Sequence, residues 1–501
     1  MPLNTFDQKQ TLVLNAAAVV IGSALPLAFA PFNLWPLAIL LPILLIWLVD
    51  RDWPLRRVFF TGFCFGLGYF GFGVYWIYNS LHDFGQAPPL VAGGLTALMI
   101  AYLALYPAAT LTVWARARFS WGRGALWLLP ALWFSFEWLK GWVGTGMPWL
   151  SLGYSQTSSP MAGYAPLLGV YGIGALCILM AVAAYLIIRD RRYVLLVLLL
   201  GLPLLGGAIK QVEWTLPADT LRVTLVQGNI PQQIKWRRDQ QQAIFNTYWR
   251  ETNTSWNSDL IIWPETALPG NSGAIEHHLL GPMQQAAVER GTPIMSGLVV
   301  SEEDNARFYN SVVLLAEERQ YYHKRHLVMF GEYYPMRWLL DLFDNLILIP
   351  YSDMSPGSDQ QPQMQIQNLV LGVTICFEDA FSRDVFRDLP QANLLVNVSN
   401  DAWFGDSTAP HQHLQIAQMR SLEAERPMLR STNTGVSAFI DHQGKLGKRS
   451  EQFKTESITA SVQGRQGKTP FYYLIEWQGP LAVGGLLVTL ILVRKRTISL
   501  S

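Results

Sequence analysis

The sequence has little charge and very little cysteine. Only 15% of its 501 residues are charged, whereas a soluble protein carries about 25%, so much of the chain cannot face water. The net charge of +1 gives no electrostatic reason to expect a nucleic-acid partner, which would need a clustered basic surface. The three cysteines, Cys64, Cys177 and Cys376, do not suggest a disulfide framework.

Long apolar runs fill the first 210 residues and return near residue 480. A helix needs about 20 mostly apolar residues to cross a bilayer, and no cleavable signal peptide is evident because the first run is long and further runs follow. The pattern predicts eight transmembrane helices and three regions, 1–209, 210–477 and 478–501. The predicted spans are 11–30, 36–49, 58–79, 89–114, 124–139, 165–188, 193–209 and 478–493.

Arginine and lysine residues predict the orientation of these spans. Short cytoplasmic loops carry an excess of Lys and Arg, and such residues follow the second, fourth, sixth and last predicted spans. The loops 31–36 and 80–88 have none, and 140–164 has only Lys140. We therefore expect both termini in the cytoplasm and residues 210–477 on the opposite side of the membrane.

Residues 210–477 have the pattern of an α/β domain. Short β-branched runs predict buried strands, and helical stretches at Asp239–Asn253 and Pro410–Glu425 lie between them. Ser407 and Thr408 are predicted to cap the second helix. The predicted strands are Leu221–Val226, Leu260–Trp263, Val312–Leu315, Leu369–Ile375 and Leu394–Val398.

Three reactive side chains follow predicted strands: Glu265 in IWPE, Lys324 in YYHK and Cys376 in VTIC. Ligands of α/β sheets bind outside the carboxyl ends of strands, so the three could share one pocket. A thiol needs a base to become a nucleophile, which Glu265 could supply, while Lys324 could hold an oxyanion. Taken singly, a strand-end Cys is usually a buried apolar residue, Glu265 could cap a helix, and Lys324 could be a solvated charge.

The motifs as a group resemble a known family. Glu265 in WPET, Lys324 ahead of HLVMFGEYYP, and Cys376 in ICFED are similar to the Glu–Lys–Cys triad of the nitrilase, or carbon–nitrogen hydrolase, superfamily. The segments LVQGNIPQQIKW and NVSNDAWFGDSTAPHQHLQ, with the predicted spans, make the whole chain resemble the apolipoprotein N-acyltransferase family. The resemblance implies a multi-pass α-helical membrane domain plus an α/β nitrilase-like α-β-β-α sandwich.

The resemblance also implies roles for individual residues. Glu265 would be the general base and acid, Lys324 the oxyanion stabiliser and Cys376 the acyl carrier. Glu332, Glu378 and Phe377 would support the site, although the family often has Tyr where Phe377 stands, so this chain offers no phenolic hydroxyl at that position. The predicted substrate-binding aromatic residues are Trp236, Trp149, Tyr334 and Trp403.

The implied reaction moves an acyl chain from a glycerophospholipid through a thioester on Cys376 to the α-amine of a diacylglyceryl apolipoprotein. It would take place on the periplasmic side of a bacterial inner membrane, on a monomer that needs no cofactor. Two alternatives stay open: a membrane-tethered amidase that passes the acyl group to water, and a transporter or lipid-binding scaffold with a decayed hydrolase domain.

Four further features have two interpretations each. The uncharged loop Gly141–Tyr154 could guide acyl chains or form an ordinary aromatic belt. Glu137 and Lys140 could pair on one helix face or be solvated. His411 and His413 could bind metal, but zinc needs three or four converging ligands, so a structural role is preferred and no metal is expected. Leu339–Pro356 could be a lid or could pack on the core.

Overall fold

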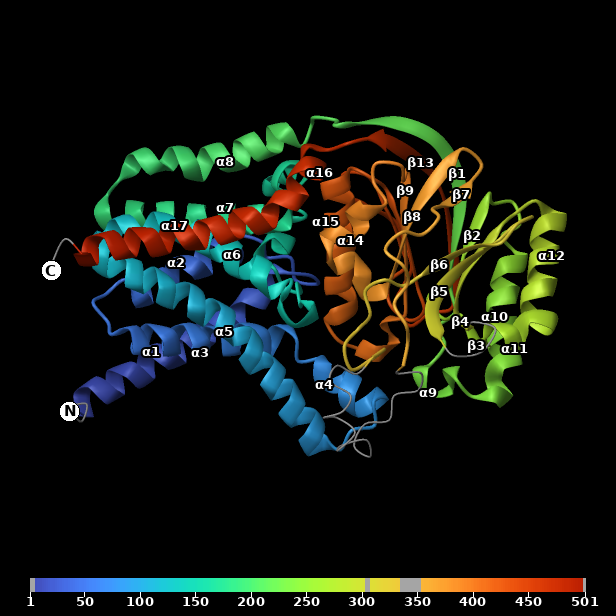
Figure 1. Ribbon diagram of the computed structural model, residues 1–501, viewed down its shortest axis with the longest axis horizontal. Helices are drawn as coiled ribbons and strands as arrows, with labels where there is room; N and C mark the ends of the chain where they lie inside the picture. The colour runs from blue at the N-terminus through green and yellow to red at the C-terminus, as the bar shows by residue number, and fades with distance from the viewer. Residues whose placement is uncertain (1–4, 302–306, 334–352, 499–501) are drawn as a thin grey trace. The chain divides into compact units, whose positions relative to one another are not determined.

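The computed structural model describes residues 5–301, 307–333 and 353–498 and divides into two compact units. The helical unit consists of Met1–Ile77, Leu90–Val212 and Tyr473–Ser501. The two-sheet unit consists of Tyr78–Pro89 and Glu213–Tyr472. Figure 1 shows the helices and strands of both units.

The helical unit is built from long apolar helices. Its main elements are α1 (Thr5–Ala24), α2 (Leu37–Val49), α3 (Leu55–Gly73), α5 (Pro89–Trp121), α6 (Leu129–Lys140), α7 (Ala165–Asp190), α8 (Leu196–Ile209) and α17 (Gln478–Ile498). Small residues allow close helix approach, as membrane helices require: a Cβ at Gly66 of α3 would lie 2.6 Å from the Cα of Ala104 of α5.

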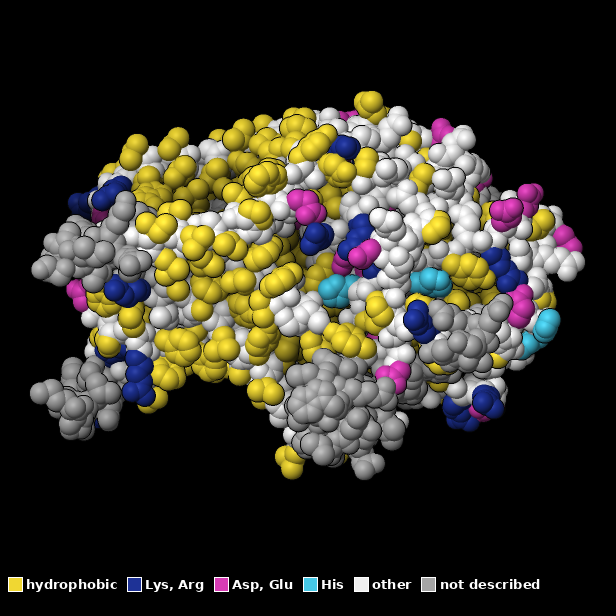
Figure 2. Space-filling model, in the orientation of Figure 1, with side chains coloured by type: hydrophobic (Ala, Val, Ile, Leu, Met, Phe, Trp, Pro, Cys, Tyr) yellow, Lys and Arg dark blue, Asp and Glu magenta, His cyan; other side chains and the backbone are white. Residues whose placement is uncertain are grey.

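The outward side chains of these helices are hydrophobic. Leu200 and Leu204 of α8 are 62% and 74% exposed, and Leu487 of α17 is 52% exposed. Figure 2 shows hydrophobic side chains covering the visible surface of this unit. A soluble protein rarely exposes so continuous an apolar surface, so lipid is the solvent that this surface fits.

The number of spans agrees only in part with the sequence prediction. Among the described residues, four helical stretches are long and apolar enough to cross a membrane, or five if the pair Leu55–Gly73 and Ile77–Phe84, bent by 59°, is one span. The count of eight is therefore not confirmed on this criterion. The four stretches are Lys9–Ala28, Pro89–Lys140, Pro160–Asp190 and Pro470–Ile491, and two shorter apolar helices are Leu37–Val49 and Tyr193–Ile209.

A buried carboxylate, that of Asp50, links three helices at one end of the helical unit. Asp50 follows α2, and its Oδ1 accepts a hydrogen bond of 2.8 Å from Arg118 Nε at the end of α5. Its Oδ2 accepts one of 2.6 Å from the Tyr185 hydroxyl and lies 3.6 Å from Arg123 and 3.7 Å from Arg189. Arg118 and Arg189 lie in the last turns of α5 and α7, and Arg123 follows α5, all on the side of the membrane that the sequence predicts to be cytoplasmic.

The strands of the two-sheet unit form two sheets. The first, seven-stranded among the described residues, has the order β13-β1-β2-β4-β5-β6, with β3 paired to β4, and the second, six-stranded, has the order β12-β11-β10-β9-β8-β7. The strands are β1 (Thr215–Gln227), β2 (Leu260–Ile262), β3 (Leu268–Asn271), β4 (Ile294–Ser301), β5 (Phe308–Leu315), β6 (Gln320–His323), β7 (Met364–Ile366), β8 (Leu369–Ile375), β9 (Leu394–Ser399), β10 (Met428–Thr432), β11 (Ala438–Ile440), β12 (Leu446–Arg449) and β13 (Glu456–Gly467). All five strands predicted from β-branched runs are present.

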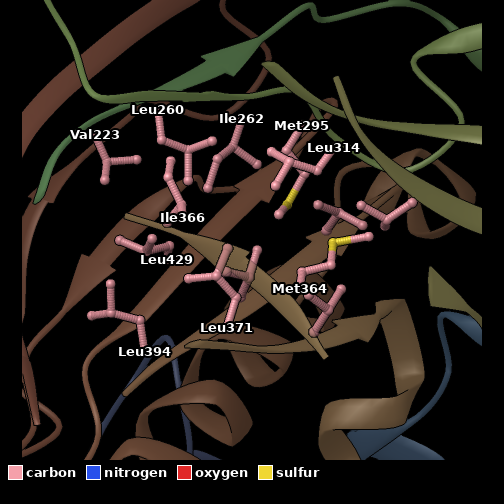
Figure 3. Close-up of a cluster of buried hydrophobic side chains, with 14 of the residues drawn as sticks. Val223, Leu260, Ile262, Met295, Leu314, Met364, Ile366, Leu371, Leu394 and Leu429 are labelled. Carbon is pink, nitrogen blue, oxygen red and sulfur yellow. The ribbon is translucent and has the colours of Figure 1, made fainter. Parts of the chain in front are cut away.

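The two sheets pack face to face with helices outside them. Inward side chains of both sheets, among them Leu260, Met295 and Leu371, form one buried cluster (Figure 3). A second cluster lies between the first sheet and the helices on its outer face, and α14 and α15 lie outside the second sheet (Figure 1). This is the α-β-β-α sandwich that the sequence predicts. The helices are α9 (Gln232–Lys235), α10 (Gln241–Asn253), α11 (Ser272–Ile275), α12 (Gly281–Arg290), α14 (Ser382–Arg387) and α15 (Ala409–Ala424).

Candidate active site

The three predicted reactive residues lie at the carboxyl ends of strands in both sheets. Lys324 and Cys376 come directly after β6 and β8, and Glu265 follows three residues after β2. Strands β2 and β4 are parallel, and β6 runs in the same direction because β4–β5 and β5–β6 are both antiparallel. The first sheet thus places Glu265 and Lys324 on the same side, at the carboxyl ends of its strands. The Glu265 Oε1 and Lys324 Nζ atoms are 4.0 Å apart.

Glu265 is buried and held by donors on both oxygens. Its Oε1 accepts a hydrogen bond of 2.8 Å from the Asn310 amide, and its Oε2 accepts one of 2.8 Å from the backbone N–H of Asn400. A glycine is required opposite: a Cβ at Gly297 would lie 2.6 Å from the Glu265 Cα. The carboxylate is therefore fixed in place, which the role predicted for it, general base, would require.

Lys324 is 1% exposed and is held mainly by Glu332. Its Nζ lies 2.9 Å from Glu332 Oε1 and 2.8 Å from Oε2. The Asn310 amide bridges Glu332 and Glu265, with a bond of 2.7 Å to Glu332. Burial lowers the pKa of the Lys324 ammonium, but Glu332 and Glu265 outweigh burial and raise it, so the side chain remains a cation.

Cys376 has a backbone φ of +53°, in the left-handed region that non-glycine residues seldom adopt. Such strain is common at functional sites, where the surrounding fold maintains it. Burial raises the pKa of the Cys376 thiol, the Glu265 carboxylate raises it further, and Lys324 opposes both. The resting group is thus a thiol rather than a thiolate.

Glu378 joins the loops that carry the lysine and the cysteine. Its Oε1 accepts hydrogen bonds from the backbone N–H groups of Arg325 (2.6 Å) and His326 (3.0 Å). Its Oε2 accepts one of 2.7 Å from the N–H of Ile375 and one of 3.0 Å from the Tyr322 hydroxyl. Burial raises the pKa of this carboxyl to about 7, although Lys324 and the N–H donors lower it.

Sequence reasoning overlooked Lys235. The residue is 2% exposed, and its Nζ donates a hydrogen bond of 3.1 Å to the Glu265 carbonyl oxygen. Burial lowers its pKa to about 8, while Glu265 and Cys376 oppose that shift. Lys235 is thus a second cation in the electrostatic field of the base and the thiol. The only available signal was its place in IKW, beside the predicted Trp236.

The predicted aromatic residues fall in different places. Trp236 follows α9, directly after Lys235, and Trp403 belongs to the turn Asp401–Phe404 of the two-sheet unit. The Trp403 carbonyl accepts a hydrogen bond of 2.8 Å from the Ser80 hydroxyl. Trp149 belongs to the helical unit, where its ring packs against Trp76 at 5.1 Å.

The remaining predicted aromatic residues are Phe377 and Tyr334. Phe377 stacks edge-on against Phe381 with 5.0 Å between ring centroids. Tyr334, like most of the predicted lid Leu339–Pro356, lies outside the described residues.

The cap predicted for the helix at 410–425 is only partly present. Helix α15 spans Ala409–Ala424, and its N-cap residue, Thr408, makes no side-chain cap bond. The Ser407 hydroxyl instead accepts from the N–H of Ala409 at 3.3 Å. Among the described residues, no three His, Cys, Asp or Glu side chains form a group that could hold a metal ion.

Glu137 and Lys140 are buried, which rules out the solvated interpretation. Glu137 is 6% and Lys140 is 2% exposed. Lys140 Nζ donates to the Trp149 carbonyl at 2.9 Å, and Glu137 Oε1 accepts from the N–H of Leu152 at 2.6 Å. Both side chains therefore hold the Trp-containing loop within the helical unit.

Comparison with known proteins covers both units. Residues 21–183 match the family model of the apolipoprotein N-acyltransferase N-terminal domain, and residues 222–470 match the carbon-nitrogen hydrolase model. The apolipoprotein N-acyltransferase of Methylococcus capsulatus is 40% identical over 91% of this chain and 91% of the relative. That of Nitrosomonas europaea is 40% identical over 91% of this chain and 92% of the relative.

This chain belongs to the apolipoprotein N-acyltransferase family. A solved CN-hydrolase superfamily protein from Xanthomonas campestris is also similar to it, with 17% identity, 53% of this chain and 97% of that chain covered, and a TM-score of 0.38. Relatives in the apolipoprotein N-acyltransferase family match this chain across both the helical unit and the two-sheet unit, so the two units are inherited together.

Proposed function

We propose that this protein transfers a fatty acyl chain from a glycerophospholipid to the α-amine of the diacylglyceryl cysteine of an apolipoprotein. The observation that carries the proposal is the placement of Glu265, Lys324 and Cys376 at converging strand ends in a chain that matches N-acyltransferases over most of its length. The apolar surface of the helical unit supports a lipid substrate.

In the first step the Cys376 sulfur attacks an ester carbonyl of the phospholipid. Glu265 takes the thiol proton, because the raised pKa of the thiol leaves little thiolate without a base. The Lys324 ammonium stabilises the oxyanion of the tetrahedral intermediate. When the intermediate collapses, Glu265 returns the proton to the departing glycerol oxygen, leaving a lysophospholipid and an acyl thioester.

In the second step the lipoprotein amine attacks the thioester carbonyl. Glu265 removes a proton from the amine, Lys324 again holds the oxyanion, and the C–S bond breaks as Glu265 passes that proton to the departing sulfur. The products are an amide and the free cysteine. Glu332 keeps the Lys324 ammonium at 2.8 Å, so that Lys324 does not form a close ion pair with the base.

We propose eight transmembrane spans, cytoplasmic termini, a periplasmic domain over 210–477 and a monomeric state. Asp50 follows α2 and pairs with Arg118 near the end of α5, Arg123 just after α5 and Arg189 near the end of α7, which supports one shared side for these helix ends. The apolar stretch Pro89–Lys140, of 52 residues, is long enough for two spans. On a Cys376→Ala background, a membrane-impermeant maleimide should label Lys445→Cys but not Arg191→Cys in intact spheroplasts, and the reverse pattern would refute the orientation.

The decisive test of function is the intact mass of the purified protein after incubation with a defined phospholipid. We expect a mass gain of one acyl chain that a diacylglyceryl lipopeptide amine discharges. Cys376→Ala should show no adduct, while the matched control Cys64→Ala should acylate normally. Discharge to water at the same rate with and without the lipopeptide would favour the amidase, and no adduct at all would favour the scaffold.

A further inference from the structure

Four charged side chains are buried together behind the cysteine loop. Asp379, Asp401, His413 and Arg430 are each at most 1% exposed. His413 lies between the two carboxylates, with Nδ1 at 2.9 Å from Asp401 Oδ1 and Nε2 at 3.0 Å from Asp379 Oδ1. Arg430 donates to the same carboxylates at 3.1 and 3.2 Å. Two cations and two anions make the cluster neutral, as burial requires.

The cluster reaches the backbone of the nucleophile. The Cys376 carbonyl oxygen accepts a hydrogen bond of 3.1 Å from the Asn397 amide and lies 3.3 Å from His413 Nε2. Arg430 in turn donates a hydrogen bond of 2.6 Å to the side-chain Oδ1 of Asn397. Both donors act on the residue whose φ of +53° needs support from its surroundings.

The protonation state of His413 decides whether it can donate in both directions. Burial and Arg430 lower the pKa of the imidazole, but Asp379 and Asp401 outweigh them and raise it to about 9. Asp401 shows the converse: Arg430 and His413 overcome burial and lower its pKa to about 2. An imidazolium has an N–H on each ring nitrogen, so one can bind Asp401 while the other faces Asp379 and the Cys376 carbonyl.

We propose that His413 is a positioning residue for acyl transfer. Its Nε2–H, with the Asn397 amide, holds the Cys376 carbonyl and so keeps the left-handed backbone that presents the thiol to Glu265 and Lys324. The buried carboxylates keep both N–H groups in place. This role rests on the proposed function, since it concerns the rate at which Cys376 accepts an acyl chain.

Two substitutions of His413 separate positioning from charge. His413→Gln retains a donor near the Nε2 position, toward Asp379 and Cys376, whereas His413→Asn retains one only near Nδ1, toward Asp401. Both remove the same positive charge. We expect His413→Asn to slow acyl-enzyme formation by about 100-fold, as a misplaced reactive group does, and His413→Gln to slow it by at most about tenfold. His442→Gln, outside the cluster, is the control and should leave the rate unchanged.

The assay measures single-turnover acylation of the full-length protein in detergent, together with thermal unfolding and the alkylation rate of Cys376 by iodoacetamide across pH. Equal loss of acylation in the Asn and Gln variants, or loss that only follows the unfolded fraction, would overturn the inference. If neither variant folds, Asn397→Ser decides: an unchanged alkylation rate would refute the role of the carbonyl contacts. An unmodified protein that forms no acyl adduct would refute the proposed function, whereas alkylation would still test the positioning.

Discussion

The pair formed by Lys324 and Glu332 predicts a specific effect of Glu332→Gln. The Lys324 ammonium now lies 2.8 Å from Glu332 and 4.0 Å from Glu265. When the Glu332 charge is removed, the buried ammonium has one carboxylate left, and we expect it to move into direct contact with Glu265. Glu265, the proposed base, would then form a close ion pair with Lys324, the cation proposed to stabilise the oxyanion.

The size of the effect follows from these distances. With an effective dielectric constant of about 20, shortening the Lys324–Glu265 separation from 4.0 Å to about 2.8 Å strengthens the attraction by about 2 kcal/mol. Glu265 must break this attraction to accept a proton, so acylation should slow by about 30-fold. Loss of one partner of a buried ion pair should also lower the free energy of unfolding, by about 3–5 kcal/mol.

The measurement is single-turnover acyl-enzyme formation, with thermal unfolding recorded on the same samples. Glu276→Gln is the matched control, because Glu276 forms a partly exposed ion pair of 2.7 Å with Arg319. Exposed pairs are worth about 0–1 kcal/mol, so the control should keep both its stability and its acylation rate. Normal acylation by folded Glu332→Gln would refute the reasoning.

Three other substitutions test separate parts of the structure. Lys235→Met should slow acylation and Cys376 alkylation below about pH 8, where Lys235 is protonated, because a cation near the thiol is lost; an unchanged alkylation rate there would contradict this. The pKa of Glu378 is raised to about 7, so its contribution to stability is full below its unfolded pKa of about 4.3 and is lost as pH rises through 7. The difference in melting temperature between the unmodified protein and Glu378→Gln should therefore become smaller as pH rises from about 4.3 to about 7. A difference that does not change with pH would contradict the raised pKa of Glu378. Asp50→Asn should destabilise the helical unit by about 3–5 kcal/mol. In detergent, the variant should therefore aggregate at a lower temperature than the unmodified protein. An unchanged aggregation temperature would contradict the role of Asp50 in linking the helices.

Local sequence predicted the regular elements well. Strands such as Leu369–Ile375 and Leu394–Ser399 are continuous apolar runs, because both faces of an inner strand in a sandwich are covered. Short strands without such a run, for example Leu446–Arg449, were not predicted, since their burial is partial and their pairing comes from neighbours. The helix beginning at Leu55 ends at Gly73 and is followed by a bend, which hydropathy alone does not indicate.

The sequence by itself determined the apolar helices and the α/β character of residues 210–477, and it predicted Glu265, Lys324 and Cys376 as site residues, because hydrophobic period and strand-end motifs are local properties. Only the tertiary structure decided that Lys235 contacts the Glu265 backbone and that His413 contacts the Cys376 carbonyl. These contacts join residues far apart in the chain. Whether a lone Lys or His is solvated or buried against a partner depends on how the two sheets pack, and no local pattern records that packing.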